Sequence, residues 1–114
     1  MVAKMSGITT HILDTSLGRP ASGVQVTLEF ANGENWAKIG SGTTNQDGRT
    51  EPLVNECQKG TYRISFEVGE YFRKSKTSAF YPSVQIQFRV ENPGEHFHVP
   101  LLLNPYGYST YRGS

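Results

Sequence analysis

The chain has almost no cysteine: Cys57 is the only one among its 114 residues. One thiol excludes an intrachain disulfide and a CxxC metal or redox motif, and it is typical of a reducing compartment. The chain also lacks an apolar run long enough for a signal peptide or a transmembrane helix. We therefore expect a cytoplasmic protein that does not enter a membrane.

An excess of charge of one sign is also lacking. Eleven Lys and Arg residues oppose ten Asp and Glu residues, which gives a formal net charge of +1. A nucleic-acid or membrane-surface ligand requires a larger basic patch than the short cluster at 73–76, so neither partner is expected. The length suits one domain that buries a core without disulfides or metal. We predict an N-terminal extension over residues 1–7 and a single domain over residues 8–114.

Alternation of apolar and polar residues with a period of two dominates the chain. It is clearest over 24–30, 62–68 and 84–90, and each segment predicts a strand with one buried face. Weaker strands fit 8–15, 36–44, 49–54, 97–103 and 106–112, and a short helix fits 70–76. About eight short strands separated by Asn-Gly, Asp-Gly and Asn-Pro turns are typical of an antiparallel sandwich or barrel. We predict an all-β sandwich.

Three histidines are the first candidates for chemistry. His96 and His98 lie two residues apart, so in a strand both would point to the same face. With His11 as a third ligand they would suit zinc, and the same groups would equally suit proton transfer near neutral pH. Because His96 follows a turn, we expect it to be exposed and without a function. His98 leads directly into an apolar strand and is the stronger candidate.

Arg49 and the C-terminal segment complete the candidates. The guanidinium of Arg49 offers a planar fork of donors for an anionic oxygen or a flat heterocycle, although a solvated arginine is the commoner case. Ser114 has no G-x-S-x-G context, which argues against a nucleophilic Ser-His-Asp triad. Residues 96–114 are rich in leucine, tyrosine and histidine. Such a segment is expected to dock against the domain and complete a site.

Several sequence stretches together resemble the transthyretin-related 5-hydroxyisourate hydrolases. They are TTHILDT, NQDGRT, FYPSVQIQF and HFHVPLLLNPYGYSTYRGS, the last of which ends in YRGS. The resemblance extends from residue 8 to residue 114. It implies a transthyretin-like antiparallel β-sandwich of two four-stranded sheets with one short helix. It also implies a homotetramer, built as a dimer of dimers, with sites at the ends of a central channel and no cofactor or metal.

The resemblance also implies the reaction and its residues. Water would open a ring amide of 5-hydroxyisourate, giving 2-oxo-4-hydroxy-4-carboxy-5-ureidoimidazoline in urate degradation. The implied catalytic residues are His11, Arg49, His98 and Ser114. Tyr111 and Arg112 would join His11, Arg49 and His98 in binding the substrate. One of the two histidines would act as general base, and Arg49 would stabilise the oxyanion.

Two other functions remain open from the sequence. A transthyretin-like protein that binds a small ligand without catalysis would share the fold. A zinc hydrolase would use His11, His96 and His98 as metal ligands. The YRGS ending argues against the first, and the scarcity of carboxylates around the H-x-H pair, apart from Glu95, argues against the second.

Overall fold

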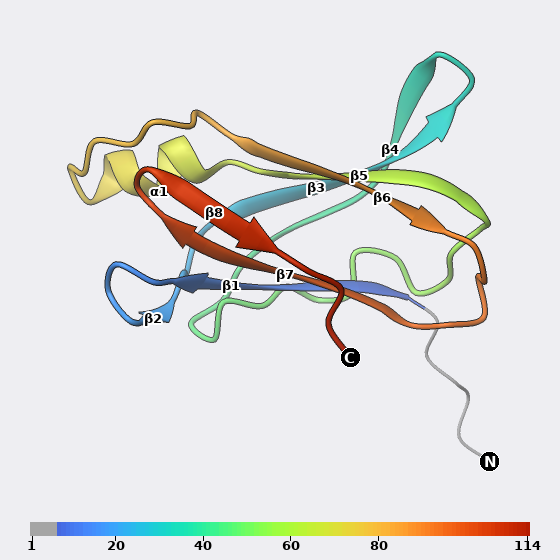
Figure 1. The fold of residues 1–114 in the computed structure, drawn as a ribbon, viewed down its shortest axis with the longest axis horizontal. Helices are drawn as coiled ribbons and strands as arrows, with labels where there is room; N and C mark the ends of the chain where they lie inside the picture. Colours follow the sequence, from blue (N-terminus) through green and yellow to red (C-terminus); the bar gives the residue numbers. More distant parts are fainter. Residues whose placement is uncertain (1–6) are drawn as a thin grey trace.

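The computed structural model describes residues 7–114 as two β-sheets packed face to face, with a helix at one end (Figure 1). In chain order the elements are β1 (Ile8–Asp14), β2 (Arg19–Pro20), β3 (Gln25–Asn32), β4 (Asn35–Thr43), β5 (Gly60–Phe66), α1 (Val68–Lys74), β6 (Val84–Val90), β7 (Phe97–Asn104) and β8 (Gly107–Thr110). One sheet has the order β2-β1-β7-β8 and the other β4-β3-β5-β6. The predicted sandwich of two four-stranded sheets with one short helix is confirmed.

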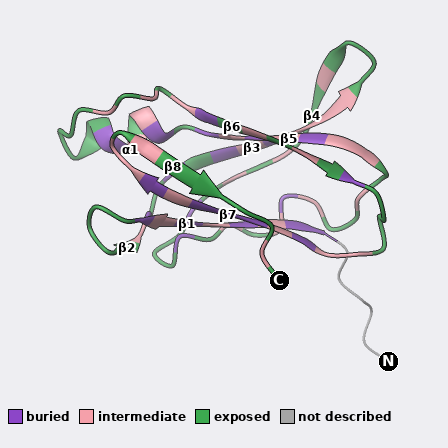
Figure 2. Ribbon diagram, viewed as in Figure 1, coloured by how far each residue is buried: buried purple, intermediate pink, exposed green. Residues whose placement is uncertain are grey.

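The core lies between the two sheets and follows the predicted alternation. In β1, Ile8, Thr10, Ile12 and Asp14 are buried, whereas the residues between them are only half-buried. Figure 2 shows buried positions along the facing strands, while most of β4 and the C-terminal segment are exposed. Thr9, His11 and His98 lie at the half-buried positions of β1 and β7.

One strand pair departs from the expected antiparallel arrangement. β1 and β7 run parallel, with Thr9 opposite His98 and His11 opposite Pro100, whereas the other pairs within residues 7–114 are antiparallel. Parallel neighbours need a long crossover connection. Here the whole second sheet serves as that crossover, because the chain forms β3 to β6 before it returns beside β1.

The strand predicted over 49–54 is absent, and this prediction was wrong. Only its ends meet β1, through isolated bridges of Arg49 to His11 and of Val54 to Ile8. Pro52 lies between them and has no N–H to donate to a ladder. Conversely, the segment around Arg19 and Pro20, expected to be a turn, forms the two-residue strand β2 against β1.

Helix α1 begins two residues earlier than predicted. Val68 was assigned to the preceding strand, but it is buried together with Phe72 on one face of the helix. Val68 satisfies both periods, because it lies two residues after Phe66 and four before Phe72. No helix within residues 7–114 is long and apolar enough to cross a membrane.

A buried carboxylate ties α1 to the end of β1. Asp14 accepts hydrogen bonds from the Tyr71 hydroxyl at 2.7 Å and from the backbone N–H groups of Ser16 and Leu17 at 3.0 and 3.2 Å. Burial raises the pKa of Asp14, but the hydrogen bonds from Ser16, Tyr71 and Leu17 outweigh it, so the pKa is lowered. Burial and the bond to Asp14 raise the pKa of Tyr71 to about 12. This junction fastens α1 to the C-terminal end of β1.

Candidate active site

A pocket of about 570 Å³ opens beside the β1–β7 pair. Its lining is mostly polar and comes from segments far apart in the sequence: Thr9, Thr10, His11, Arg49, Thr50, His96, His98, Tyr111, Gly113 and Ser114. The structure thus brings together all the predicted catalytic residues, with Tyr111 beside them. Of the residues predicted to bind substrate, only Arg112 does not line this pocket.

Arg49 reaches the pocket on a tight loop that docks against β1. The Asn45 side-chain oxygen accepts hydrogen bonds from the N–H groups of Asp47 at 2.8 Å and Arg49 at 3.1 Å. The Ile12 N–H then donates to the Gly48 carbonyl at 2.9 Å. Gly48 has a φ of 76°, and a Cβ there would collide with the Ile12 carbonyl oxygen. Only glycine lets the loop approach this closely and place Arg49 beside His11.

Thr9 lies between the imidazoles of His96 and His98. Its Oγ1 is 2.8 Å from Nδ1 of His98 and 3.0 Å from Nε2 of His96. Thr9 and His11 lie on the same face of β1, between the buried Ile8, Thr10 and Ile12. The sequence did not reveal the contact of Thr9 with the two imidazoles, because the contact depends on which strand pairs with β1 and in which register.

His96 does not fit its expected exposed position. It is half-buried, its ring contacts Thr9, and its Nδ1 is buried without a hydrogen-bond partner among residues 7–114. The expectation of an exposed side chain was wrong, because Thr9 of the neighbouring strand β1 contacts the ring.

The surroundings of His98 lower the pKa of its imidazole. Burial of the ring is the largest cause of the lowered pKa, and the nearby charges of Arg49, His11 and His96 lower the pKa further. A hydrogen bond with the Thr9 backbone has a smaller, opposing effect. Burial and the nearby charges each disfavour the imidazolium form. His98 is therefore mainly neutral near pH 7, since an unperturbed histidine already titrates at about 6.5.

The C-terminal segment docks against His98 through its backbone. The Gly113 N–H donates to the His98 carbonyl at 2.8 Å, and the Thr110 hydroxyl donates to the Pro100 carbonyl at 2.8 Å. A Cβ on Gly113 would lie 2.6 Å from Cδ2 of His98, so the position accepts only glycine without a shift. The predicted docking is thus confirmed at Gly113, whereas the side chains of Tyr111 and Ser114 remain exposed.

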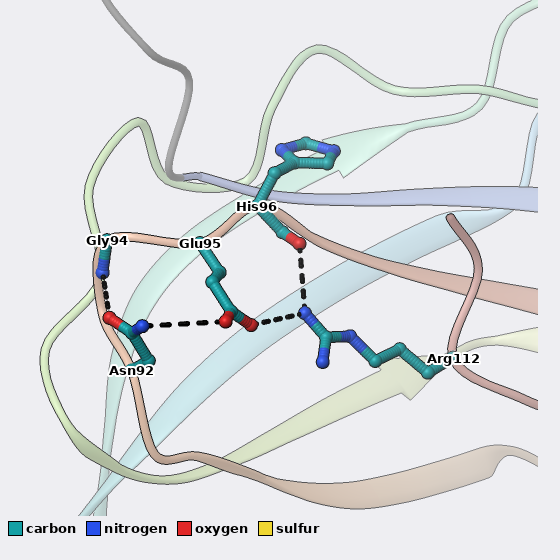
Figure 3. Close-up of polar contacts among 5 residues, drawn as sticks. All are labelled: Asn92, Gly94, Glu95, His96 and Arg112. Carbon is teal, nitrogen blue, oxygen red and sulfur yellow. Dashed lines mark hydrogen bonds and ion pairs between the residues drawn. The ribbon is translucent and has the colours of Figure 1, made fainter.

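Arg112 does not line the pocket, and Figure 3 shows its side chain reaching toward Glu95 and the His96 carbonyl. Its Nη2 donates to Glu95 Oε1 at 2.9 Å and to the His96 carbonyl at 3.4 Å. Its guanidinium carbon lies 4.5 Å from the centre of the Phe97 ring. These contacts fasten the C-terminal segment to the start of β7, and substrate binding by Arg112 stays a prediction.

The pocket does not offer a converging set of metal ligands. Within residues 7–114, no three His, Cys, Asp or Glu side chains are grouped in a way that would hold a metal ion. Two ring nitrogens of the predicted zinc set, Nε2 of His96 and Nδ1 of His98, instead lie at the Thr9 hydroxyl. The donor geometry therefore does not favour the zinc alternative.

Comparison with known proteins identifies the family of the chain. A family model described as the HIUase/Transthyretin family matches residues 8–113. The 5-hydroxyisourate hydrolase of Salmonella dublin is 45% identical over 109 residues, which cover 94% of this chain and 80% of that protein. The solved structure of Klebsiella pneumoniae 5-hydroxyisourate hydrolase matches with a TM-score of 0.85 and 36% identity over 95% of this chain and 99% of that one. Sea bream transthyretin, solved with thyroxine, matches with a TM-score of 0.89 at 25% identity over 94% of each chain. The chain belongs to the HIUase/transthyretin family.

Proposed function

We propose that this protein is a 5-hydroxyisourate hydrolase of urate degradation, which adds water across a ring amide of its substrate. The observation that carries the proposal is the convergence of His11, Arg49, His98 and Ser114 on one pocket with Tyr111. Identity favours the hydrolase branch, at 45% and 36% to two hydrolases and 25% to a transthyretin.

The reaction needs a base for water and a group that stabilises developing negative charge. The water oxygen bonds to the amide carbonyl carbon while His11 or His98 takes a proton from water. The carbon–nitrogen bond then breaks, and the departing nitrogen receives a proton from the same imidazole. A base must be neutral to act, and the lowered pKa of His98 keeps that imidazole neutral.

Arg49 would bind the flat, anionic substrate and stabilise the oxyanion. Arg49 and His98 line the same pocket, so a bound molecule would contact both groups. A planar fork of donors suits a carbonyl or enolate oxygen, and removal of one such donor typically costs about 10²–10³-fold in turnover. Tyr111 would contact the substrate, and Ser114 would position a histidine or the departing nitrogen.

We also propose that the protein forms a homotetramer, arranged as a dimer of dimers. Phe80, Tyr106 and Tyr111 are 69%, 67% and 57% exposed, which is unusual for large aromatic side chains. β8 is also the last strand of its sheet, and an uncovered edge is a ready site for pairing with another copy. Sedimentation equilibrium would give the mass, and a monomer would contradict this part. A cytoplasmic location is likewise proposed, because a single half-buried thiol suits a reducing compartment.

A coupled ultraviolet assay tests the proposed activity. Urate oxidase generates 5-hydroxyisourate in the cuvette, and its decay is followed with and without this protein, with chelator present throughout. Accelerated decay that is lost in folded His98→Ala supports the hydrolase. Decay no faster than the spontaneous rate contradicts it and would favour a small-ligand binding protein, the function that the transthyretin–thyroxine structure represents. Activity that disappears only with chelator would restore the zinc alternative.

A further inference from the structure

The Thr9 hydroxyl couples the protonation of two imidazoles. It lies within hydrogen-bond distance of His98 Nδ1, at 2.8 Å, and of His96 Nε2, at 3.0 Å. A hydroxyl has a single hydrogen to donate, although it can also accept. When both bonds form, one ring nitrogen accepts from Thr9 and the other donates to it. The tautomer of one histidine therefore fixes the tautomer of the other.

The surroundings of His96 determine which group donates in each of the two hydrogen bonds of Thr9. Nδ1 of His96 is buried and has no hydrogen-bond partner within the described residues 7–114. Buried N–H groups without an acceptor are rarer in proteins than acceptors left short of a donor. The hydrogen of neutral His96 accordingly belongs on Nε2, which donates to Thr9. The Thr9 hydrogen is then directed to Nδ1 of His98.

We infer that Thr9 and His96 are positioning residues that hold neutral His98 with its hydrogen on Nε2, facing the pocket as a donor. The ring has few other orientations. Nδ1 is bound at Thr9, and Cδ2 packs against Gly113, where a Cβ would come within 2.6 Å. The edge that remains for the pocket consists of Cε1 and Nε2.

This inference rests on the proposed hydrolysis and divides the work between the histidines. His11 takes the proton of water as the water oxygen bonds to the carbonyl carbon. His98 Nε2–H, together with Arg49, donates to the carbonyl oxygen as it becomes negative. When the carbon–nitrogen bond breaks, its electron pair stays on nitrogen, and His11 returns the proton there. A neutral imidazole can act as such a donor where its pKa is lowered.

Nitrogen NMR of the histidine rings tests the inference without substrate. In ¹⁵N-labelled protein at a pH where His98 is neutral, both histidines should show a protonated Nε2 and an unprotonated Nδ1. His98 Nδ1 should carry the shift of a hydrogen-bonded nitrogen, whereas His96 Nδ1 should not. Thr9→Val should remove this difference and Thr9→Ser should keep it. A protonated Nδ1 on either histidine, or an unchanged His98 Nδ1 in Thr9→Val, would overturn the inference.

Kinetics supply the second measurement, with a matched control. Thr15→Val deletes another hydroxyl that bridges the same strands, since Thr15 donates to the Leu103 carbonyl at 3.1 Å outside the pocket. Thr9→Val should lower kcat by roughly tenfold, the effect of one ordinary hydrogen bond, while Thr9→Ser and Thr15→Val stay near wild type. Equal kcat in Thr9→Val and wild type would overturn the positioning role. A wild-type protein without hydrolase activity would instead refute the proposed function. The NMR measurement would still test the tautomers of His96 and His98, because it needs no substrate.

Discussion

Gly113→Ala should damage the site while leaving the sandwich intact. The added Cβ would lie 2.6 Å from His98 Cδ2 and 3.3 Å from Pro100 Cγ. Favourable carbon–carbon contacts lie at about 3.5–4.0 Å, so the shortfall at His98 is about 1 Å. Either the segment lifts and loses the Gly113 bond to the His98 carbonyl, or the imidazole turns away from Thr9. Each route costs about one hydrogen bond, roughly 1 kcal/mol.

The catalytic effect should exceed the effect on stability. A displacement of about 1 Å in a catalytic group can cost about 10²-fold in rate, so we expect kcat/KM to fall by about ten- to a hundredfold. The loss of roughly 1 kcal/mol would lower Tm by about 4 °C. Gly107→Ala is the matched control, because its Cβ would meet only Asn104 at ordinary contact distances of 3.7 and 3.8 Å.

The coupled ultraviolet assay measures kcat/KM for both variants, and differential scanning calorimetry measures Tm. Full activity in Gly113→Ala, with Tm unchanged, would refute the reasoning, because it would mean that the close approach of the segment to His98 has no role. A large fall in Tm for Gly107→Ala as well would show that the assay reports general damage to the C-terminal hairpin.

Three further predictions concern the C-terminal segment and the Asp14 junction. Glu95→Gln removes the ion pair of Arg112 but leaves its contacts with the His96 carbonyl and Phe97. It should lower kcat modestly if Arg112 holds the C-terminal segment in place; an improved KM with kcat unchanged would instead favour Arg112 as a substrate contact. Because the pKa of Asp14 is lowered, its carboxylate stabilises the fold above the unfolded value of 3.8, and this stability is lost as pH falls through the lower folded-state pKa. Asp14→Asn should therefore lower Tm at pH 7 and flatten the acid dependence of Tm in a calorimetric pH series; an unchanged slope would contradict this. Removing residues 111–114 should abolish turnover but keep the β-sheet circular dichroism spectrum, because Tyr111 and Ser114 are exposed; full turnover would contradict their place in the site.

The alternation of apolar and polar residues predicted most of the strands. In the structure, His11 and His98 lie at half-buried positions of β1 and β7, between buried neighbours. The pattern failed where one residue fitted both the period of a strand and the period of a helix. Val68 continues the alternation of β5 and also lies one helical turn before Phe72, so only the packing of α1 against the core decided its state.

Contacts between segments far apart in the chain could not be predicted from the sequence. Nothing in the residues near Thr9 reveals that β7 lies beside it in parallel register, and thus that its hydroxyl meets two histidines. His96 was misjudged for the same reason, since its burial depends on the partner strand. Arg49 was identified through the family resemblance, but its position beside His11 depends on the contact of Gly48 with β1.

The parallel pairing of β1 with β7 also has a consequence for the biogenesis of the enzyme. Thr9 and His98 are 89 positions apart, so a ribosome releases β1 long before the strand that must lie beside it. Contacts of such long range form slowly, because the intervening chain has to be ordered first. A nascent or half-folded chain would hold His11 and His98 apart, and turnover would begin only when the crossover has closed. Activity should therefore be recovered during refolding only when β7 pairs with β1, so that an activity assay would report the completion of folding.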